Sequence, residues 1–344
     1  MDETSEQRPF RVGRRGIAAT GGTVLALAVL LATPQLLGSR VEEAMGTLGS
    51  ADPSWLWLAG GGFGIAVVAA AGAWRSALGL CGGRIGLTDA TARFGVGSLV
   101  NTFTPVHAGD AVRIGLFARA LDQDERLWRT GGAFAALGAA RAVVLAALVA
   151  AGVATRALPA WPLFVLVGIA VVAGVLAFAV RRRDAYGRAA HVLDAFRKLG
   201  REPGLACRLV AWVALSLGGK VLAAAAVGSA LGIGSPIAAA LVIVPALEVT
   251  GLVPLTPGNV GITSGAVAVV YHAHGTSFAA ALAGGIAFHA VETAVGIAFG
   301  LGSLAWLAPY PSPGVRRVAL LAAGASASLA VAGALSATVL IPLV

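Results

Sequence analysis

The sequence contains few charged residues, few cysteines and none of the common catalytic signatures. Only 12% of its 344 residues are charged, whereas soluble globular proteins have about 25%. This shortage excludes a soluble enzyme, a disordered tail and a coiled coil. Two cysteines cannot build a disulfide framework. No H-E-x-x-H, G-x-S-x-G, P-loop or C-x-x-C pattern occurs, so we expect neither an enzyme nor a need for a cofactor or metal.

Hydrophobic residues, by contrast, make up 58% of the chain, and the mean hydropathy is +0.85. The 47 glycines show no collagen period, and glycine at this level suits closely packed membrane helices. The apolar runs are too long for β-barrel strands, which need about 9–11 alternating residues. The sequence therefore predicts an all-α polytopic membrane protein, with residues 1–344 forming one integral membrane domain.

Seven apolar runs are long enough to cross a bilayer as helices. They cover residues 17–37, 55–80, 130–154, 161–180, 209–231, 277–305 and 316–341. The first run follows a basic segment, 1–15, but has no clear small-x-small cleavage site, so we expect an uncleaved helix. Two further apolar stretches, 93–121 and 236–274, are each interrupted by proline and glycine.

The positions of the basic residues predict the orientation of the chain. With the N-terminus in the cytoplasm, only Arg40 and Arg156 lie outside, and Arg141 and Lys220 lie within the membrane. The remaining 21 of the 25 basic residues then face the cytoplasm, as the positive-inside rule requires. We therefore expect a plasma membrane protein with a cytoplasmic N-terminus and an external C-terminus, and the net charge of +9 does not imply a nucleic acid partner.

The longest polar stretch, 181–208, is basic and amphipathic. It is too short for a catalytic domain and suits a helix at the membrane surface. Its charges either contact anionic lipid headgroups or serve only as a topology signal.

The two interrupted stretches predict re-entrant hairpins of opposite orientation. Pro105 ends a helix in the first hairpin, and Asp110 is suited to cap the next half-helix. In the second, Thr256 is a candidate N-cap followed by Pro257. Broken backbone at membrane depth must be buried or line a wet cavity, and two such breaks point to a transporter with inverted repeats. Both half-helix N-termini would face mid-membrane and favour an anion. The alternative is two kinked helices that pack closely through glycine.

Ionisable residues inside apolar runs are expected to have a functional or structural role, because a charge at the bilayer centre costs about 2.5–3.5 kcal/mol. Arg141 either contacts a phosphate or carboxylate, or forms a structural bridge with Glu248 or Glu292. Lys220 either contacts an anionic headgroup or becomes neutral. His289 and Glu292 share a helix face at a spacing of three, where they form a proton relay or a structural pair.

Other candidates lie in the hairpins or outside the membrane. Asp110 is first a helix cap and second a functional acid, and His107 can contact substrate or titrate. His272 and His274 are weak evidence for a metal site, so we expect no metal.

One segment of the first hairpin is similar to a known family signature. Its matching residues are Gly97, Asn101, Pro105, Gly109, Asp110 and Arg113. The spacing resembles G-x-x-x-N-x-x-x-P-x-x-x-G-E-x-x-R of the lysylphosphatidylglycerol synthase transmembrane (flippase-like) family, with aspartate in place of glutamate. Arg141 is similar in placement to the arginine of that family's next helix.

The second hairpin resembles the family's second signature, P-x-x-P-G-G-x-G-x-x-E, from Pro254 onward. Asn259 replaces a glycine, Ser264 stands at the glutamate, and His289 stands where an arginine commonly follows. The resemblance covers nearly the whole chain and implies an integral membrane lipid translocator. The bifunctional synthases carry an aminoacyl-transferase domain after the membrane domain, and we expect none here because the chain ends at Val344. The departures imply a different headgroup or a diverged paralogue.

Our first hypothesis is a flippase or translocator for an anionic lipid, a phospholipid or a polyprenyl phosphate. Its predicted substrate-binding residues are Asn101, His107, Asp110, Arg113, Arg141, Lys220, Thr256 and Asn259, and its possible proton relay is Glu248, His289 and Glu292. The alternative is a non-catalytic membrane partner of a separate lipid- or glycan-modifying enzyme, such as a transferase, that docks on 181–208. The third hypothesis is a membrane-embedded transferase. It is disfavoured because the sequence has no recognisable set of catalytic residues.

Overall fold

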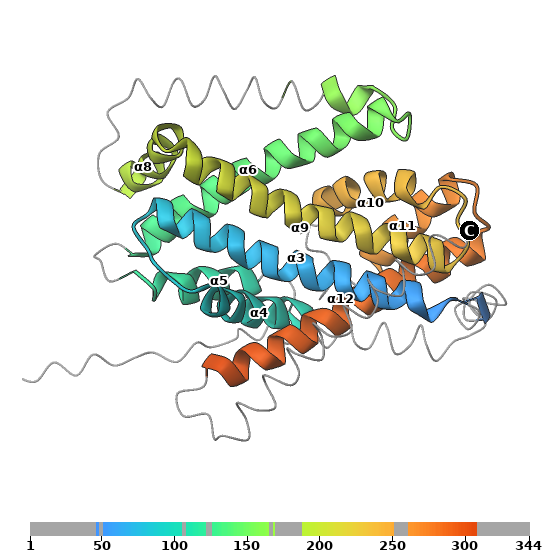
Figure 1. The fold of residues 1–344 in the computed structure, drawn as a ribbon, viewed down its shortest axis with the longest axis horizontal. Coiled ribbons are helices and arrows are strands. Elements are labelled where there is room, and N and C mark those ends of the chain that lie inside the picture. The colour runs from blue at the N-terminus through green and yellow to red at the C-terminus, as the bar shows by residue number, and fades with distance from the viewer. Residues whose placement is uncertain are drawn as a thin grey trace, which may run out of the picture.

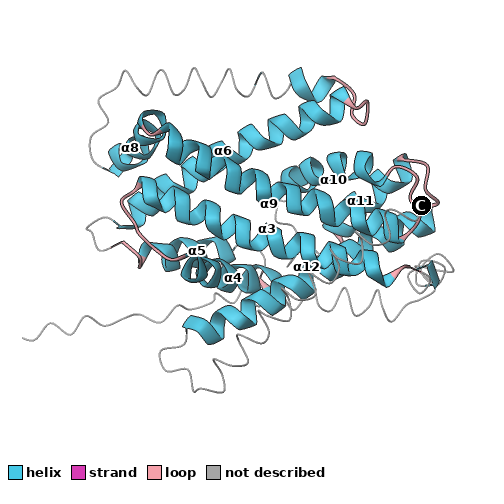
Figure 2. Ribbon diagram, viewed as in Figure 1, coloured by secondary structure: helices cyan, strands magenta, loops and turns pink. Residues whose placement is uncertain are grey.

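The computed structural model describes residues 46–47, 51–104, 108–121, 126–164, 168, 188–250 and 261–307. These residues form helices joined by turns, with no strand among them (Figure 2). The helices are α3 (Pro53–Leu80), α4 (Leu87–Phe103), α5 (Ala108–Ala118), α6 (Arg126–Ala154), α8 (Arg188–Arg201), α9 (Pro203–Ala230), α10 (Pro236–Thr250), α11 (Ile262–Ala273) and α12 (Phe278–Leu307). The predicted all-α class is confirmed for this part of the chain.

Four helices, α3, α6, α9 and α12, are long and apolar enough to cross a membrane. They coincide with the predicted runs 55–80, 130–154, 209–231 and 277–305. A helix of 28 residues spans about 42 Å, which exceeds the hydrocarbon thickness of about 30 Å. Many large apolar side chains on these helices are exposed, as expected for surfaces that contact lipid. The predicted runs 17–37 and 316–341, and most of 161–180, lie outside the described residues.

Helices α3 and α9 lie side by side through the length of the structure (Figure 1). Their contact depends on small residues spaced four apart, Gly62 with Ala66 and Gly219 with Ala223. A Cβ atom on Gly219 would lie 2.6 Å from the Gly62 carbonyl oxygen, so only glycine permits this approach. The buried Ser216 hydroxyl also donates a hydrogen bond of 2.9 Å to the Ala66 carbonyl.

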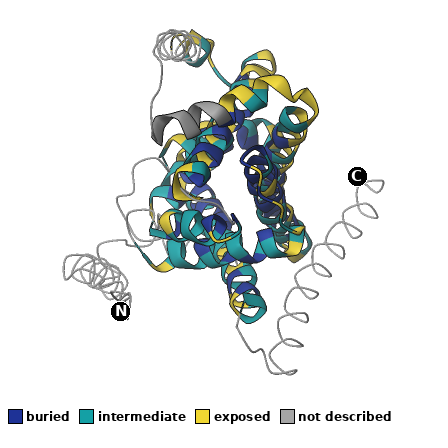
Figure 3. Cartoon of the chain, turned by 90° about the vertical axis from the view of Figure 1, so that its left-hand side faces the viewer, coloured by how far each residue is buried: buried dark blue, intermediate teal, exposed yellow. Residues whose placement is uncertain are grey.

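Two hydrophobic clusters form the core on either side of this crossing. In the first, Trp74 stacks on Phe117 with ring centroids 4.7 Å apart. In the second, Phe63 meets Phe288 edge-on at 5.0 Å. Viewed end-on, the buried positions of the helices face one another, while exposed positions lie on the outside (Figure 3).

Each interrupted stretch forms two helices that pack against each other. Helices α4 and α5 lie near the end of the structure where α3 finishes, and α10 and α11 lie toward the opposite end (Figure 1). Helix α4 ends at Phe103, and Thr104 is extended with ψ 142°, as expected before a proline. Asp110 lies within the first turn of α5, so the expectation that it is the N-cap is wrong. Helix α11 begins at Ile262, later than predicted, after Gly261 with φ 85°.

Residues 181–187 of the predicted surface segment 181–208 lie outside the described residues. Helix α8 covers 188–201, and α9 begins at Pro203, so residues 203–208 belong to a candidate membrane-spanning helix and not to the surface segment. Proline is favoured at the first position of a helix because its missing N–H would be unpaired there anyway. Helix α8 packs against the first part of α6.

Candidate functional site

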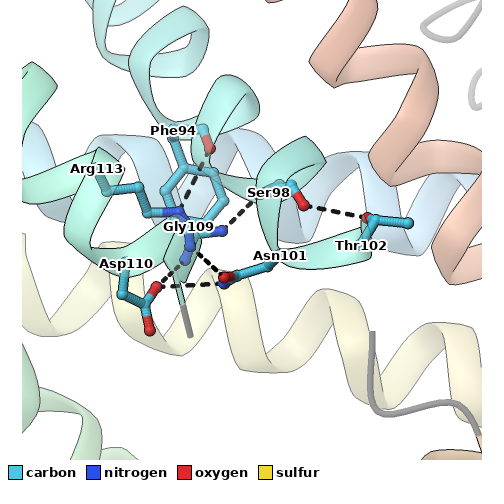
Figure 4. Close-up of polar contacts among 7 residues, drawn as sticks. All are labelled: Phe94, Ser98, Asn101, Thr102, Gly109, Asp110 and Arg113. Atoms are coloured by element: carbon cyan, nitrogen blue, oxygen red, sulfur yellow. Dashed lines mark hydrogen bonds and ion pairs between the residues drawn. The ribbon is translucent and has the colours of Figure 1, made fainter. Parts of the chain in front are cut away.

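Arg113 on α5 is the centre of a compact polar cluster between α4 and α5 (Figure 4). One Nη group forms an ion pair of 2.6 Å with Asp110, and the other donates to the Ser98 hydroxyl at 2.7 Å. The guanidinium also lies 4.1 Å from the centre of the Phe94 ring, a cation–π contact. Only 14% of the Arg113 side chain is exposed, so these partners compensate the loss of its hydration.

The glycines of the first signature make room for this cluster. A Cβ atom on Gly97 would lie 2.8 Å from Nε of Arg113, and one on Gly109 would lie 2.6 Å from Cγ of Asn101. The Asn101 side-chain oxygen accepts a hydrogen bond of 2.7 Å from the Gly109 amide. Because α4 ends at Phe103 and α5 begins at Ala108, α5 packs back against α4 and these residues meet. The spacing of the signature thus describes one packed unit.

A second charged cluster joins three other helices. Glu248 on α10 lies between two cations, 2.8 Å from Nζ of Lys220 on α9 and 3.1 Å from Nε of Arg141 on α6. Each carboxylate oxygen faces one cation. Sequence analysis named Glu248 and Glu292 as alternative partners of Arg141, and in the structure the partner is Glu248.

Arg141, one member of this second cluster, lies near the middle of α6. Arg141 is about 22 Å from the start of α6 and about 20 Å from its end, at 1.5 Å per residue. The Glu248 side chain is only 9% exposed and that of Lys220 25%, whereas 48% of Arg141 is exposed. Arg141 is therefore the accessible member of the cluster.

The two clusters lie on neighbouring helices. Helices α5 and α6 pack together, as do α6 and α10. The described candidates Asp110, Arg113, Arg141 and Lys220 thus belong, with Glu248, to one charged region.

His289 and Glu292 form a separate pair on α12. Nδ1 of His289 lies 3.9 Å from a Glu292 carboxylate oxygen, which confirms that the two side chains share a face. The buried Nδ1 makes no hydrogen bond in the described part of the chain. Glu248 forms its ion pairs with Lys220 and Arg141 on other helices, and the proton relay of Glu248, His289 and Glu292 stays a prediction.

Three predicted substrate-binding residues, His107, Thr256 and Asn259, lie outside the described residues. His272 and His274 direct Nδ1 to the backbone oxygens of Thr276 and Val270. Within the described ranges, no group of three or more metal-binding side chains comes together.

Sequence analysis missed two partners of Arg113, namely Phe94 and Ser98. They lie one helical turn apart on α4 and share a face with Asn101. This spacing could have identified Phe94 and Ser98 as partners of Arg113. It does so only when α5 is known to pack against this face of α4.

A comparison with models of protein families matches residues 17–300 to the lysylphosphatidylglycerol synthase TM region. A comparison with curated proteins finds no match.

Proposed function

The chain belongs to the lysylphosphatidylglycerol synthase transmembrane family, and we propose that it translocates an anionic lipid across the plasma membrane. The carrying observation is the ion-pair cluster of Arg141, Lys220 and Glu248, in which Arg141 lies near the middle of α6 and is half exposed. Charges at this depth are costly unless they are paired or used. In this proposal the headgroup binds to Arg141 beside Lys220, while the acyl or polyprenyl chains stay in the lipid.

The helix arrangement supports an alternating-access mechanism. The units α4–α5 and α10–α11 lie toward opposite ends of the structure, and in the proposal they are re-entrant hairpins related as inverted repeats. Pro245 lies inside α10, one turn before Glu248. A proline there removes one backbone hydrogen bond and favours bending. Bending at this point would move Glu248 relative to the cations on α6 and α9.

The proposed orientation places the end that carries α8 in the cytoplasm, together with the N-terminus. Arg75 lies in the last two turns of α3, Arg84 lies between α3 and α4, and Arg126 begins α6. These ends of α3 and α6 lie on the same side of the structure as α8 (Figure 1). This asymmetry follows the positive-inside rule. The chain would bind and move its lipid without catalysing a reaction on it.

The test is movement of tail-labelled phosphatidylglycerol in proteoliposomes. Wild-type protein should accelerate the exchange between leaflets over protein-free vesicles. Arg141→Ala should remove most of this activity, by about tenfold or more, because a lost charge-assisted contact contributes about 1.5–3 kcal/mol. Arg126→Ala is the matched control, since Arg126 is an exposed arginine at the start of the same helix. Unchanged transport in folded Arg141→Ala would reject the assigned site.

The amphipathic helix α8 supports a second candidate, a docking surface for a separate lipid-modifying transferase. If the folded wild-type protein moves no lipid, the docking function is favoured over lipid transport. It then predicts that a soluble transferase purifies with the protein and that deletion of 188–201 abolishes the association. If the association were lost only when the protein unfolds, the result would count against a docking surface on α8.

A further inference from the structure

We infer that the headgroup of the transported lipid is a phosphodiester with a single negative charge. The inference rests on the proposed function and narrows its substrate. It disfavours phosphomonoesters, which carry up to two negative charges, and headgroups with no net negative charge. Phosphatidylglycerol and a glycosylated polyprenyl phosphate both fit this class.

The ion pairs of the charged region leave one positive charge unmatched. Asp110 neutralises Arg113 at 2.6 Å. Glu248 is shared between Lys220 and Arg141, and each of its oxygens contacts one of them. One carboxylate balances one of these two cations, so the region as a whole carries a net charge of one. A ligand with one negative charge makes it neutral.

The two breaks in the chain add little to this balance. Residues 251–260 contain no ionisable side chain, and residues 105–107 contain only His107. Glu248 forms its ion pairs with Lys220 and Arg141. Within the described part of the chain, the count therefore depends on the five charged residues themselves.

Arg141 presents the unmatched charge in a form that suits a phosphodiester. It meets Glu248 through Nε, and within the described residues its two Nη groups make no hydrogen bond. Nearly half of its side chain is exposed. Two parallel N–H groups of a guanidinium match the two non-bridging oxygens of a phosphodiester. Arg113, by contrast, uses both Nη groups on Asp110 and Ser98.

The buried carboxylate of Glu248 limits how much negative charge a bound ligand can carry. A ligand on the Nη face of Arg141 lies on the same guanidinium as the Glu248 carboxylate. Among the described residues no further cation contacts Glu248 to balance a second ligand charge. That charge would therefore be repelled by the buried carboxylate, because like charges repel at short range in a medium of low dielectric. A zwitterionic headgroup would bring its own cation to Arg141 and Lys220. Both alternatives bind less well than a monoanion.

The first experiment compares four lipids with the same labelled tails in wild-type proteoliposomes. They are phosphatidylglycerol, phosphatidic acid, phosphatidylethanolamine and lysylphosphatidylglycerol. Phosphatidylglycerol should move at least about tenfold faster than each of the others, equivalent to about 1.4 kcal/mol. Equal rates for all four would overturn the inference and leave the proposed function standing. No movement of any lipid would refute the proposed function and the inference with it.

A variant tests the role of the carboxylate. Glu248→Gln removes the counter-charge, so the ratio of phosphatidic acid to phosphatidylglycerol movement should rise at least about tenfold. Glu202→Gln is the control, because Glu202 is exposed at the start of α9 and makes no capping bond. An unchanged ratio in folded Glu248→Gln would overturn the inference. If that variant does not fold, the four-lipid comparison in wild type decides alone.

The last experiment uses a water-soluble compound that has the headgroup but no lipid tails. Glycerophosphoglycerol has the same phosphodiester headgroup without tails, and we expect vesicles containing the protein to retain it. Its release at the rate of lipid movement would overturn the assignment to a lipid.

Discussion

Gly219→Ala tests whether close contact between α3 and α9 holds the structure together. The new Cβ would lie 2.6 Å from the Gly62 carbonyl oxygen and 3.0 Å from the Ala66 amide nitrogen. Both are backbone atoms of α3, so no side chain can move aside. The two helices must separate by several tenths of an ångström, and the buried hydrogen bond from Ser216 to Ala66, now 2.9 Å, would lengthen.

The expected cost combines three effects. Overpacking of this kind costs about 1–3 kcal/mol, and weakening the hydrogen bond costs about 1 kcal/mol. Alanine is a better helix former than glycine by about 1 kcal/mol, which offsets part of the loss. We therefore expect a net loss of about 1–3 kcal/mol in the free energy of unfolding.

Gly218→Ala is the matched control for this prediction. Gly218 is the neighbouring residue of α9, and a Cβ there meets nothing within 4 Å. It should leave the stability unchanged or raise it by up to about 1 kcal/mol. Unfolding of the purified protein in mixed micelles, followed by circular dichroism, measures both variants. Equal stability of the two variants would show that the helices do not approach as described.

Two further predictions concern local structure. Asn101→Ala removes the acceptor of the Gly109 amide, so hydrogen exchange at the start of α5 should become faster, with a cost of about 1–3 kcal/mol for an unpaired buried donor; unchanged exchange would contradict this role. Hydrogen bonds from the Ser54 hydroxyl and amide lower the pKa of Asp52, which precedes α3. The cap is therefore present above about pH 4 and is lost as the pH falls through the folded-state pKa; a carboxyl resonance that titrates at or above the ordinary value would refute it.

Hydropathy was sufficient to predict the four described spanning helices, because long apolar runs have few other structures available in a bilayer. Proline chemistry also predicted the end of α4, since the ring of Pro105 disfavours helix in the residue before it. The same reasoning did not locate the start of α11. The positive φ of Gly261 depends on the path of the chain before it, which no local pattern specifies.

The partners within the charged region were only partly predictable. Depth in an apolar run identified Arg141 and Lys220 as residues that need a counter-charge. The choice of Glu248 over Glu292 was left open, because it depends on which helices pack together. The interruption predicted in 236–274 shows the same limit: α10 continues through the buried Pro245 and ends at Thr250.

Photo-crosslinking of the headgroup tests the central claim most directly. Phosphatidylglycerol with a photoreactive headgroup would be incorporated with the protein, and labelled peptides would be identified by mass spectrometry. We predict label on α6 and α10 near Arg141 and Glu248, competed by unlabelled phosphatidylglycerol, lost in Arg141→Ala and retained in Arg126→Ala. Label confined to α8 and the helix ends at the membrane surface would contradict a headgroup site at membrane depth.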